Sequence, residues 1–283
     1  MRIRQLIPAA MLGFLAAGGA ASAQYVFMPF DHPNAIYTDA SGINDQRKIV
    51  GSFIDTNGRL HGYMKMGPTF TTIDFPGATS TIAAGINNLG RIVGIFVDPQ
   101  GRRRGFVKNG NVFKVIHVPG FVQTEATGIN NLNQVVGSTV GADNVRHGYI
   151  FKNGKFMRIH LEGAAFTAAA GINDFGRIVG YYGDENGVQH GFLKIANTFQ
   201  TIDFPGAVLT SLTGINNSGL MAGQFESVPG VSHGFVTDGV TFTQLDVPGA
   251  TQTFAHGPNT FAEVVGLFFD GQQVGHGFVA RPQ

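Results

Sequence analysis

Apolar residues in this chain come in short runs that alternate with polar residues and end at turn-forming sequences. In one stretch the runs fall at 69–75, 81–86, 91–97 and 104–108, separated by Pro-Gly, Asn-Asn-Leu-Gly and Asp-Pro-Gln-Gly. Such alternation is typical of half-buried strands, and the separators are turn formers. No segment after residue 23 keeps a helical period for more than about two turns. The pattern predicts an all-β chain.

The same unit of four runs is written six times. Gly-Ile-Asn, or Gly-Pro-Asn in the last copy, begins every 43 residues, at Gly42, Gly85, Gly128, Gly171, Gly214 and Gly257. The copies contain neither an insertion nor a deletion. Four antiparallel strands in about 43 residues match one blade of a β-propeller. A solenoid is the alternative, but it needs atypical capping repeats, and the terminal copies here are as regular as the inner ones.

The two ends of the repeat array complement each other. The last copy stops after its third run, at residues 278–280, and the stretch 25–31 resembles the missing fourth run. We therefore expect 25–31 to complete the last blade, which would close the ring and cover two sheet edges. The predicted fold is an all-β, six-bladed β-propeller with four-stranded blades, a single domain spanning 24–283.

Residues 1–23 have the composition of a secretory signal peptide. Arg2 and Arg4 precede a short apolar stretch, and Ala21-Ser22-Ala23 provides a small-residue cleavage site. The apolar stretch is too short and too rich in glycine to span a membrane comfortably. We expect cleavage near Ala23, a secreted or periplasmic protein, and no transmembrane segment in the mature chain.

Composition and motifs exclude several classes of function. The chain has no Cys, which excludes disulfides, thiolate metal sites and a lipid-modified cysteine. Its 19 Lys and Arg nearly balance 18 Asp and Glu, so no basic field points to a nucleic-acid partner. The common phosphate-binding, serine hydrolase and metalloprotease motifs are absent from the sequence.

The repeated motifs are similar to those of a known family. Gly-Ile-Asn-Asn/Asp-x-Gly-x-Ile/Val-Val-Gly, His-Gly-Phe and Thr-Ile-Asp-Phe-Pro-Gly-Ala recur, with substitutions, from residue 25 to the C-terminus. They resemble the bacterial extracellular repeat called the HAF family. The resemblance implies a secreted bacterial protein with a β-propeller-like fold, and it implies no catalytic motif.

Residues that interrupt the repeated columns are the candidates for function. The strand after an invariant Thr is predicted to line the central channel, and alternate positions on it share one face. The first such row is Asp39, Ile82, Glu125, Ala168, Ser211 and Phe254, and the second is Ser41, Ala84, Thr127, Ala170, Thr213 and His256. Asp39, Glu125 and His256 are the ionisable members, and together with Ser211 they are the predicted ligand-binding residues. The three ionisable groups could also coordinate a metal or act as acid and base, or face channel water without a function.

A second set of candidates precedes the Pro-Gly turn of each copy. Its members are Asp31, Asp74, His117, His160, Asp203 and Asp246. An Asp or His there can accept a hydrogen bond from the turn backbone, and we expect this local role. The alternative is a ring at an axial mouth that holds a divalent cation or a polar ligand. The histidines of the His-Gly motif are expected to form hydrogen bonds within their own blades.

The function we expect is a non-catalytic binding or scaffold module, because a propeller presents a rigid face of loops. Its ligand would be an extracellular glycan or protein, bound by a monomer without a cofactor. Specificity is expected at the non-repeated positions Tyr37, Gln123, Phe166, Leu209 and Gln252. The alternative is a hydrolase or lyase acting on a polymer, with the three ionisable row residues as its catalytic groups. The fold alone does not separate the two, because propellers host both roles.

Overall fold

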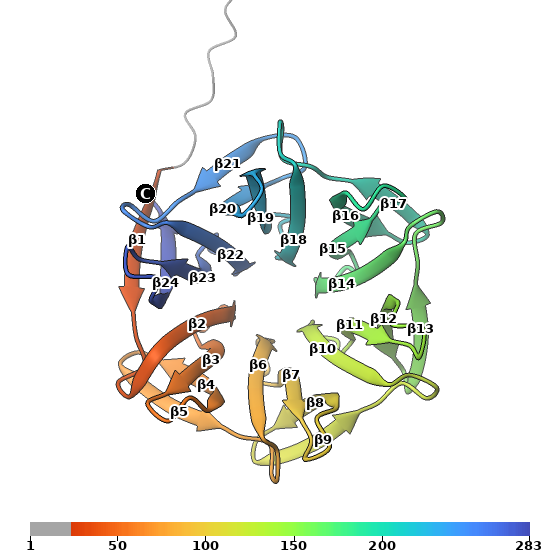
Figure 1. Cartoon of the computed structure of the whole chain (residues 1–283), viewed down its shortest axis with the longest axis horizontal. Coiled ribbons are helices and arrows are strands. Elements are labelled where there is room, and N and C mark those ends of the chain that lie inside the picture. Colours follow the sequence, from red (N-terminus) through yellow and green to blue (C-terminus); the bar gives the residue numbers. More distant parts are fainter. Residues whose placement is uncertain (1–23) are drawn as a thin grey trace, which may run out of the picture.

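The computed structural model describes residues 24–283, which form 24 β-strands in six four-stranded sheets around a central axis (Figure 1). Neighbouring strands within each sheet are antiparallel. This arrangement confirms the predicted six-bladed β-propeller. The predicted signal peptide lies outside the described residues. Between residues 24 and 283, no helix is long and apolar enough to cross a membrane.

Every blade has the same strand order from the axis outward. The innermost strands are β2 (Ala35–Ile43), β6 (Ser80–Ile86), β10 (Gln123–Ile129), β14 (Phe166–Ile172), β18 (Leu209–Ile215) and β22 (Gln252–Pro258). The second strands are β3 (Ile49–Asp55), β7 (Ile92–Val97), β11 (Val135–Val140), β15 (Ile178–Gly183), β19 (Met221–Val228) and β23 (Val264–Phe269). The third strands are β4 (Leu60–Met66), β8 (Arg103–Asn109), β12 (Arg146–Lys152), β16 (Gln189–Ile195), β20 (Val231–Thr237) and β24 (Gly275–Pro282). The outermost strands are β5 (Thr69–Ile73), β9 (Val112–Ile116), β13 (Lys155–Ile159), β17 (Thr198–Thr201), β21 (Phe242–Leu245) and, in the sixth blade, β1 (Tyr25–Phe30).

The two ends of the described chain meet in the sixth blade. Strand β1 pairs antiparallel with β24, from Tyr25 opposite Pro282 to Phe30 opposite Gly277 (Figure 1). The prediction that 25–31 completes the last blade is therefore confirmed, with the strand ending one residue earlier. The ring closes by main-chain hydrogen bonds between segments at opposite ends of the described chain, and β1 covers the edge that β24 would otherwise leave unpaired.

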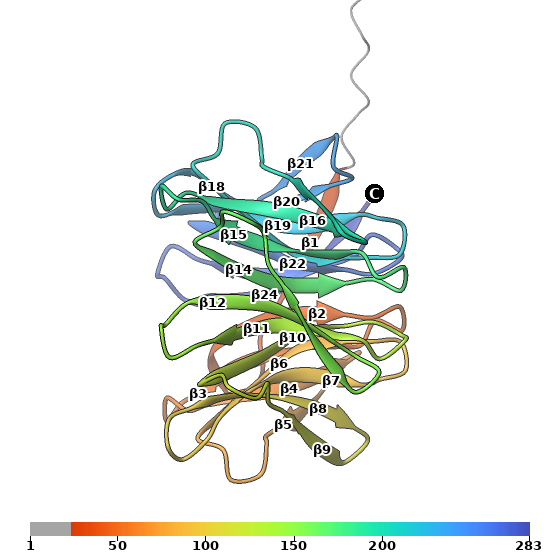
Figure 2. The ribbon, with the colours of Figure 1, turned by 90° about the vertical axis from the view of Figure 1, so that its right-hand side faces the viewer.

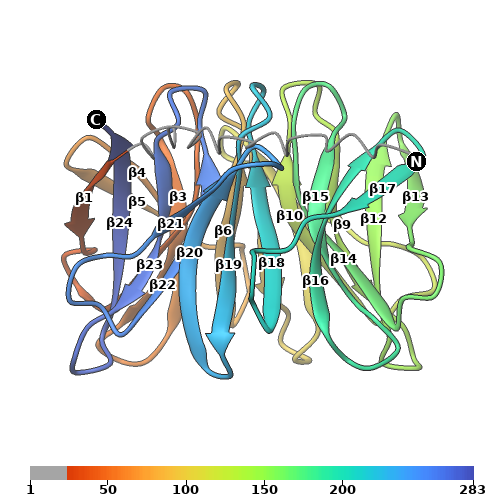
Figure 3. The same ribbon diagram turned by 90° about the horizontal axis from the view of Figure 1, so that it is seen from above.

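Loops gather on two faces of the ring, as side views show (Figures 2 and 3). Because successive strands are antiparallel, the turns from first to second strand and from third to fourth strand lie on one face. We call this the turn face, and each Gly-Ile-Asn motif ends an innermost strand there. The hairpins from second to third strand and the connections between blades lie on the opposite face, which we call the connection face.

A pair of aromatic rings lies at the centre of every blade. The Phe or Tyr of the His-Gly motif is buried and packs against the Phe of the outermost strand. The pairs are Tyr63–Phe70, Phe106–Phe113, Tyr149–Phe156, Phe192–Phe199, Phe235–Phe242 and Phe278–Phe27. A glycine of the second strand lies close to both the innermost strand and the buried ring: a Cβ on Gly94 would lie 2.0 Å from the carbonyl oxygen of Ile82 and 2.6 Å from Cζ of Phe106. The repeated glycine of the Val-Gly column is thus required first by the close carbonyl of the innermost strand, which recurs in every blade.

Replacing that glycine tests the packing. We expect Gly94→Ala to lower the free energy of unfolding by about 1–3 kcal/mol, because the added methyl group overpacks the blade core. Gly271→Ala is the matched control, since a Cβ there would meet nothing within 4 Å. Urea denaturation of both variants measures the difference, and equal midpoints would contradict this account of the column.

Candidate functional site

A ring of asparagine side chains ties the blades together at the turn face. The Asn44 Nδ2 donates a hydrogen bond to the carbonyl oxygen of Asn87 in the next blade, 3.1 Å away. The same bond recurs from Asn87, Asn130, Asn173, Asn216 and Asn259 to the following blade. The Asn44 Oδ1 accepts from the backbone N–H groups of Gln46 and Lys48 in its own turn. The turn itself was predicted from the sequence, whereas the bonds between blades were not.

The residues after these asparagines form a second polar ring around the axis, made of Asp45, Asn88, Asn131, Asp174, Asn217 and Thr260. Neighbours are hydrogen-bonded at most seams; the Asn131 Nδ2, for example, donates to Asp174 Oδ2 over 2.8 Å. The space enclosed is about 80 Å³, well below the roughly 300–1,000 Å³ of most small-molecule sites. The mouth of the axis on the turn face is therefore too small for a sugar.

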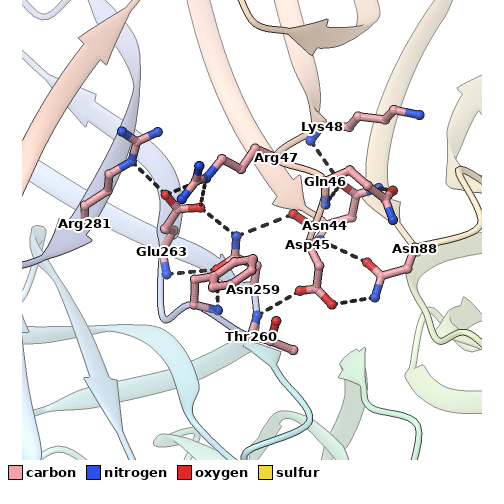
Figure 4. A network of polar contacts seen from close by, with 11 residues as sticks. Asn44, Asp45, Gln46, Arg47, Lys48, Asn88, Asn259, Thr260, Glu263 and Arg281 are labelled. Atoms are coloured by element: carbon pink, nitrogen blue, oxygen red, sulfur yellow. Dashed lines mark hydrogen bonds and ion pairs between the residues drawn. The ribbon is translucent and has the colours of Figure 1, made fainter.

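Ring closure between the sixth and first blades has its own ion-pair cluster (Figure 4). The Glu263 carboxylate, buried at 3% exposure, accepts from Arg47 Nε at 3.0 Å and pairs with Arg281 Nε at 2.7 Å. The Asn259 Nδ2 also donates to it, over 2.8 Å. Burial acts to raise the pKa of Glu263, but the hydrogen bonds and both arginine charges outweigh it and hold the pKa below its ordinary value. Glu263 breaks its column but was not among the residues predicted to form a site.

Asp39 and His256, two of the predicted candidates, lie together. The His256 Nδ1 is 3.3 Å from Asp39 Oδ1 and donates to the carbonyl oxygen of Ala40 over 2.9 Å. The Ser41 hydroxyl donates to Asp39 Oδ2 over 2.7 Å. Burial acts to raise the pKa of Asp39 and to lower that of His256, but the ion pair and its hydrogen bonds outweigh both effects. The pKa of Asp39 is therefore held low and that of His256 held high.

Glu125, the third candidate, belongs to a separate cluster. Its carboxylate accepts from Arg103 of the second blade and from Arg146 and Ser138 of its own blade. Burial acts to raise its pKa, but the two arginines outweigh this and hold the pKa below its ordinary value. Within residues 24–283 no hydrogen bond or ion pair joins Glu125 to either of the other two ionisable candidates. The three residues thus do not surround one cleft.

The predicted rows differ in what they line. The axial space above the asparagine ring is bordered by Ser41, Ala84, Thr127, Ala170 and Thr213 of the second row, with the glycines that follow them. The first-row residues are not part of this lining, and Glu125, Ala168 and Ser211 are buried where blades meet. A β-bulge in each innermost strand, such as that between Ala40 and Gly42, breaks the simple alternation from which both rows were predicted to share a face.

The candidates before the Pro-Gly turn pair with their own blades. Histidine Nδ1 atoms of the His-Gly motif contact four of the aspartates: His276 with Asp31, His61 with Asp74, His190 with Asp203 and His233 with Asp246, at 2.7–3.0 Å. His117 is contacted instead by Arg104, at 2.9 Å. His160 has no such contact among the described pairs. No group of three Asp, Glu or His in the described part of the chain is placed to hold a metal ion.

A cleft opens between the third and fourth blades on the connection face. At the next seam the gap is bridged, because Gln189 Nε2 donates to the predicted candidate Ser211 across it, over 2.6 Å. Between β12 and β14, however, Arg146 turns back to its own blade and the small Ala168 stands opposite. The result is a cleft of about 380 Å³ lined by Arg146, Phe166, Tyr181 and Gln189, among others. Phe166 is one of the five non-repeated positions predicted to carry specificity.

The ion pair of Asp39 and His256 predicts a pH dependence. Folding raises the pKa of His256. Its protonated ring therefore stabilises the folded protein fully below about pH 6.5, and this contribution is lost as the pH rises through the pKa of the folded state. Folding lowers the pKa of Asp39, so its carboxylate stabilises the folded protein fully above about pH 4, and this contribution is lost as the pH falls through the pKa of the folded state. We expect His256→Gln to lose most stability relative to wild type between these limits. Chemical denaturation from pH 3 to 9 measures this, and a loss that does not vary with pH would be evidence against a charged pair.

Comparisons with known proteins identify the fold. No family model and no curated protein matches the chain. The lectin AAL from Aleuria aurantia, solved as a mutant with Fucα1-6GlcNAc, is 12% identical over 88% of this chain and 93% of that chain, with a TM-score of 0.56. AofleA from Arthrobotrys oligospora is 13% identical over 90% and 86%, with a TM-score of 0.56. The propeller domain of the Trilobed protease from Pyrococcus furiosus is 12% identical over 89% and 80%, with a TM-score of 0.52. AAL is itself a six-bladed β-propeller, and the likeness shows that this chain shares that architecture.

Proposed function

We propose that the protein is a non-catalytic glycan-binding propeller and that the cleft between β12 and β14 is its binding site. The observation that carries the proposal is the set of side chains in this cleft. Phe166 and Tyr181 place two aromatic rings, with centroids 6.3 Å apart, beside the guanidinium group of Arg146 and the amide of Gln189. Aromatic surface with a few converging polar donors is the composition of a small-molecule site.

The chemistry of the cleft suits a sugar. One face of a sugar ring presents C–H groups that pack on an aromatic ring, and its hydroxyl groups need fixed donors and acceptors. The Nη1 of Arg146 is engaged by Glu125 and Ser138, and a guanidinium group has five N–H donors in all. The Nε and Nη2 donors of Arg146 have no partner within residues 24–283, so they can serve hydroxyl groups. Glu125 thus acts as a positioning residue for Arg146.

Further support comes from fold and sequence. The fold neighbours AAL and AofleA match this chain over most of their length, and AAL was solved with a fucose-containing disaccharide. The N-terminal sequence and the HAF-like motifs support a secreted or periplasmic bacterial protein, and we propose that it acts as a monomer there. An extracellular glycan is a ligand that such a protein would meet. A protein ligand fits this cleft less well, because specific protein interfaces bury about 800 Å² per partner.

A screen on a glycan array, followed by calorimetry with the strongest ligand, tests the proposal. We expect Tyr181→Ser to weaken binding by about tenfold or more, since an aromatic contact of roughly 1.5 kcal/mol is lost. Serine stands at the same position in the first and third blades, as Ser52 and Ser138, so the fold should accept it. Gln224→Ala, at the equivalent position of the fifth blade, is the matched control and should bind like wild type.

Two results would refute the proposal. One is an array on which the folded protein binds no glycan. The other is a bound glycan whose affinity is the same for wild type and Tyr181→Ser, which would place its site elsewhere on the propeller.

A further inference from the structure

A second cavity lies between the second and third blades, toward the turn face, and has a different chemistry. Its volume is about 390 Å³, within the range of small-molecule sites. The lining includes Val107 and Val115 of the second blade and Phe151 and Phe156 of the third. Val115 is exposed at 53%, so apolar surface continues from the groove to its rim. The cleft of the proposed function lies on the other side of the third blade and shares none of these residues.

The groove differs in its lining from its equivalent between the sixth and first blades, which includes Lys65, because the third blade departs from a repeated feature. In three other blades a lysine at the end of the third strand covers the Phe of the outermost strand. These cation–π pairs are Lys65–Phe70, Lys108–Phe113 and Lys194–Phe199, with Nζ 5.5–5.6 Å from the ring centre. The equivalent residue in the third blade is Phe151, whose ring lies 4.7 Å from that of Phe156. In the third blade an aromatic ring thus takes the place of a lysine ammonium group beside the Phe of the outermost strand.

Two positively charged side chains line this groove and form no ion pair within the described residues. Arg91 and Lys114 are part of its lining, and among the described residues neither side chain makes an ion pair or a hydrogen bond. No Asp or Glu lines the groove. At the seam between the sixth and first blades, the position equivalent to Arg91 is Glu263, which is neutralised by two arginines. In the groove between the second and third blades, the positive charges of Arg91 and Lys114 are therefore available to pair with a negatively charged ligand group.

We propose that this groove binds a small amphipathic anion, with an apolar aliphatic or aromatic body and a carboxylate or sulfonate head. The body would pack against Phe151, Phe156 and the two valines, and the head would accept hydrogen bonds from Arg91 and Lys114. A neutral analogue keeps the apolar packing but loses the charge-assisted hydrogen bonds to Arg91 and Lys114. A cationic analogue meets repulsion from both charged side chains. The site is independent of the proposed glycan cleft.

The experiment uses the mature chain and the fluorescent probe anilinonaphthalene sulfonate, displaced by octanoate, 1-octanol or octyltrimethylammonium. We expect octanoate to bind about tenfold or more tightly than 1-octanol, because charge-assisted hydrogen bonds favour the anion. The cation should bind most weakly. Equal displacement by octanoate and 1-octanol would overturn the proposal, as would the absence of any displaceable probe.

Three variants locate the site, and each uses residues that other blades carry at the same positions. Phe151→Thr copies Thr237 of the fifth blade, removes the aromatic ring without changing the charge, and should weaken probe and octanoate binding by about tenfold or more. The double variant Arg91→Gln with Lys114→Thr copies Gln134 and Thr71, and should weaken octanoate about tenfold while leaving 1-octanol unchanged. Tyr181→Ser, in the other cleft, should bind octanoate like wild type. Unchanged octanoate binding in Phe151→Thr or in the double variant, or its loss in Tyr181→Ser, would contradict the assignment.

Discussion

At four of the six seams the innermost strands approach one another so closely at their Gly-Ile-Asn ends that no Cβ fits between them without a shift; the glycines are Gly85, Gly128, Gly171 and Gly214. A Cβ on Gly171 would lie 2.9 Å from the Cα of Gly214, and one on Gly128 would lie 2.7 Å from the carbonyl oxygen of Ala170. The asparagine amides then bond each strand end to the next. This contact fixes the radius of the ring and reduces the axis to spaces of about 80–90 Å³. The axial spaces are therefore too small for a ligand the size of a sugar.

The third blade departs from the repeat at Glu125 and Phe151, and both proposed sites lie at its borders. On the connection face, Glu125 draws Arg146 into its own blade and leaves a cleft against the fourth blade. Toward the turn face, Phe151 replaces a lysine and gives the groove against the second blade an aromatic lining. The repeated residues thus build the same core in every blade, and a few substitutions in the third blade give the two proposed sites their own side chains. In our proposal, ligands bind where one blade differs from the others.

The fold was fully predictable from the sequence because a repeat of constant length fixes both the strand pattern and the number of blades. Closure by β1 was predictable for the same reason: the last copy lacked one run and the first residues supplied it. The candidate sites were only partly predictable. Breaks in the columns drew attention to Asp39 and His256, which do meet, and to Phe166, which lines the cleft. Glu125 lies apart from that pair because two arginines from neighbouring strands hold it, and such partners are not visible in a column-by-column comparison. The bulge in each innermost strand also changes which residues face the axis.

The central claim is that one asymmetric cleft, and not the repeated frame, recognises the ligand. The most direct test is the number of glycan molecules bound per chain, measured by native mass spectrometry with the strongest ligand from the array. We expect one specific molecule per chain, because the aromatic and polar side chains of Arg146, Phe166 and Tyr181 come together at the seam between the third and fourth blades and at no other seam of residues 24–283. Saturation at several equivalent molecules per chain, up to one per blade, would contradict it.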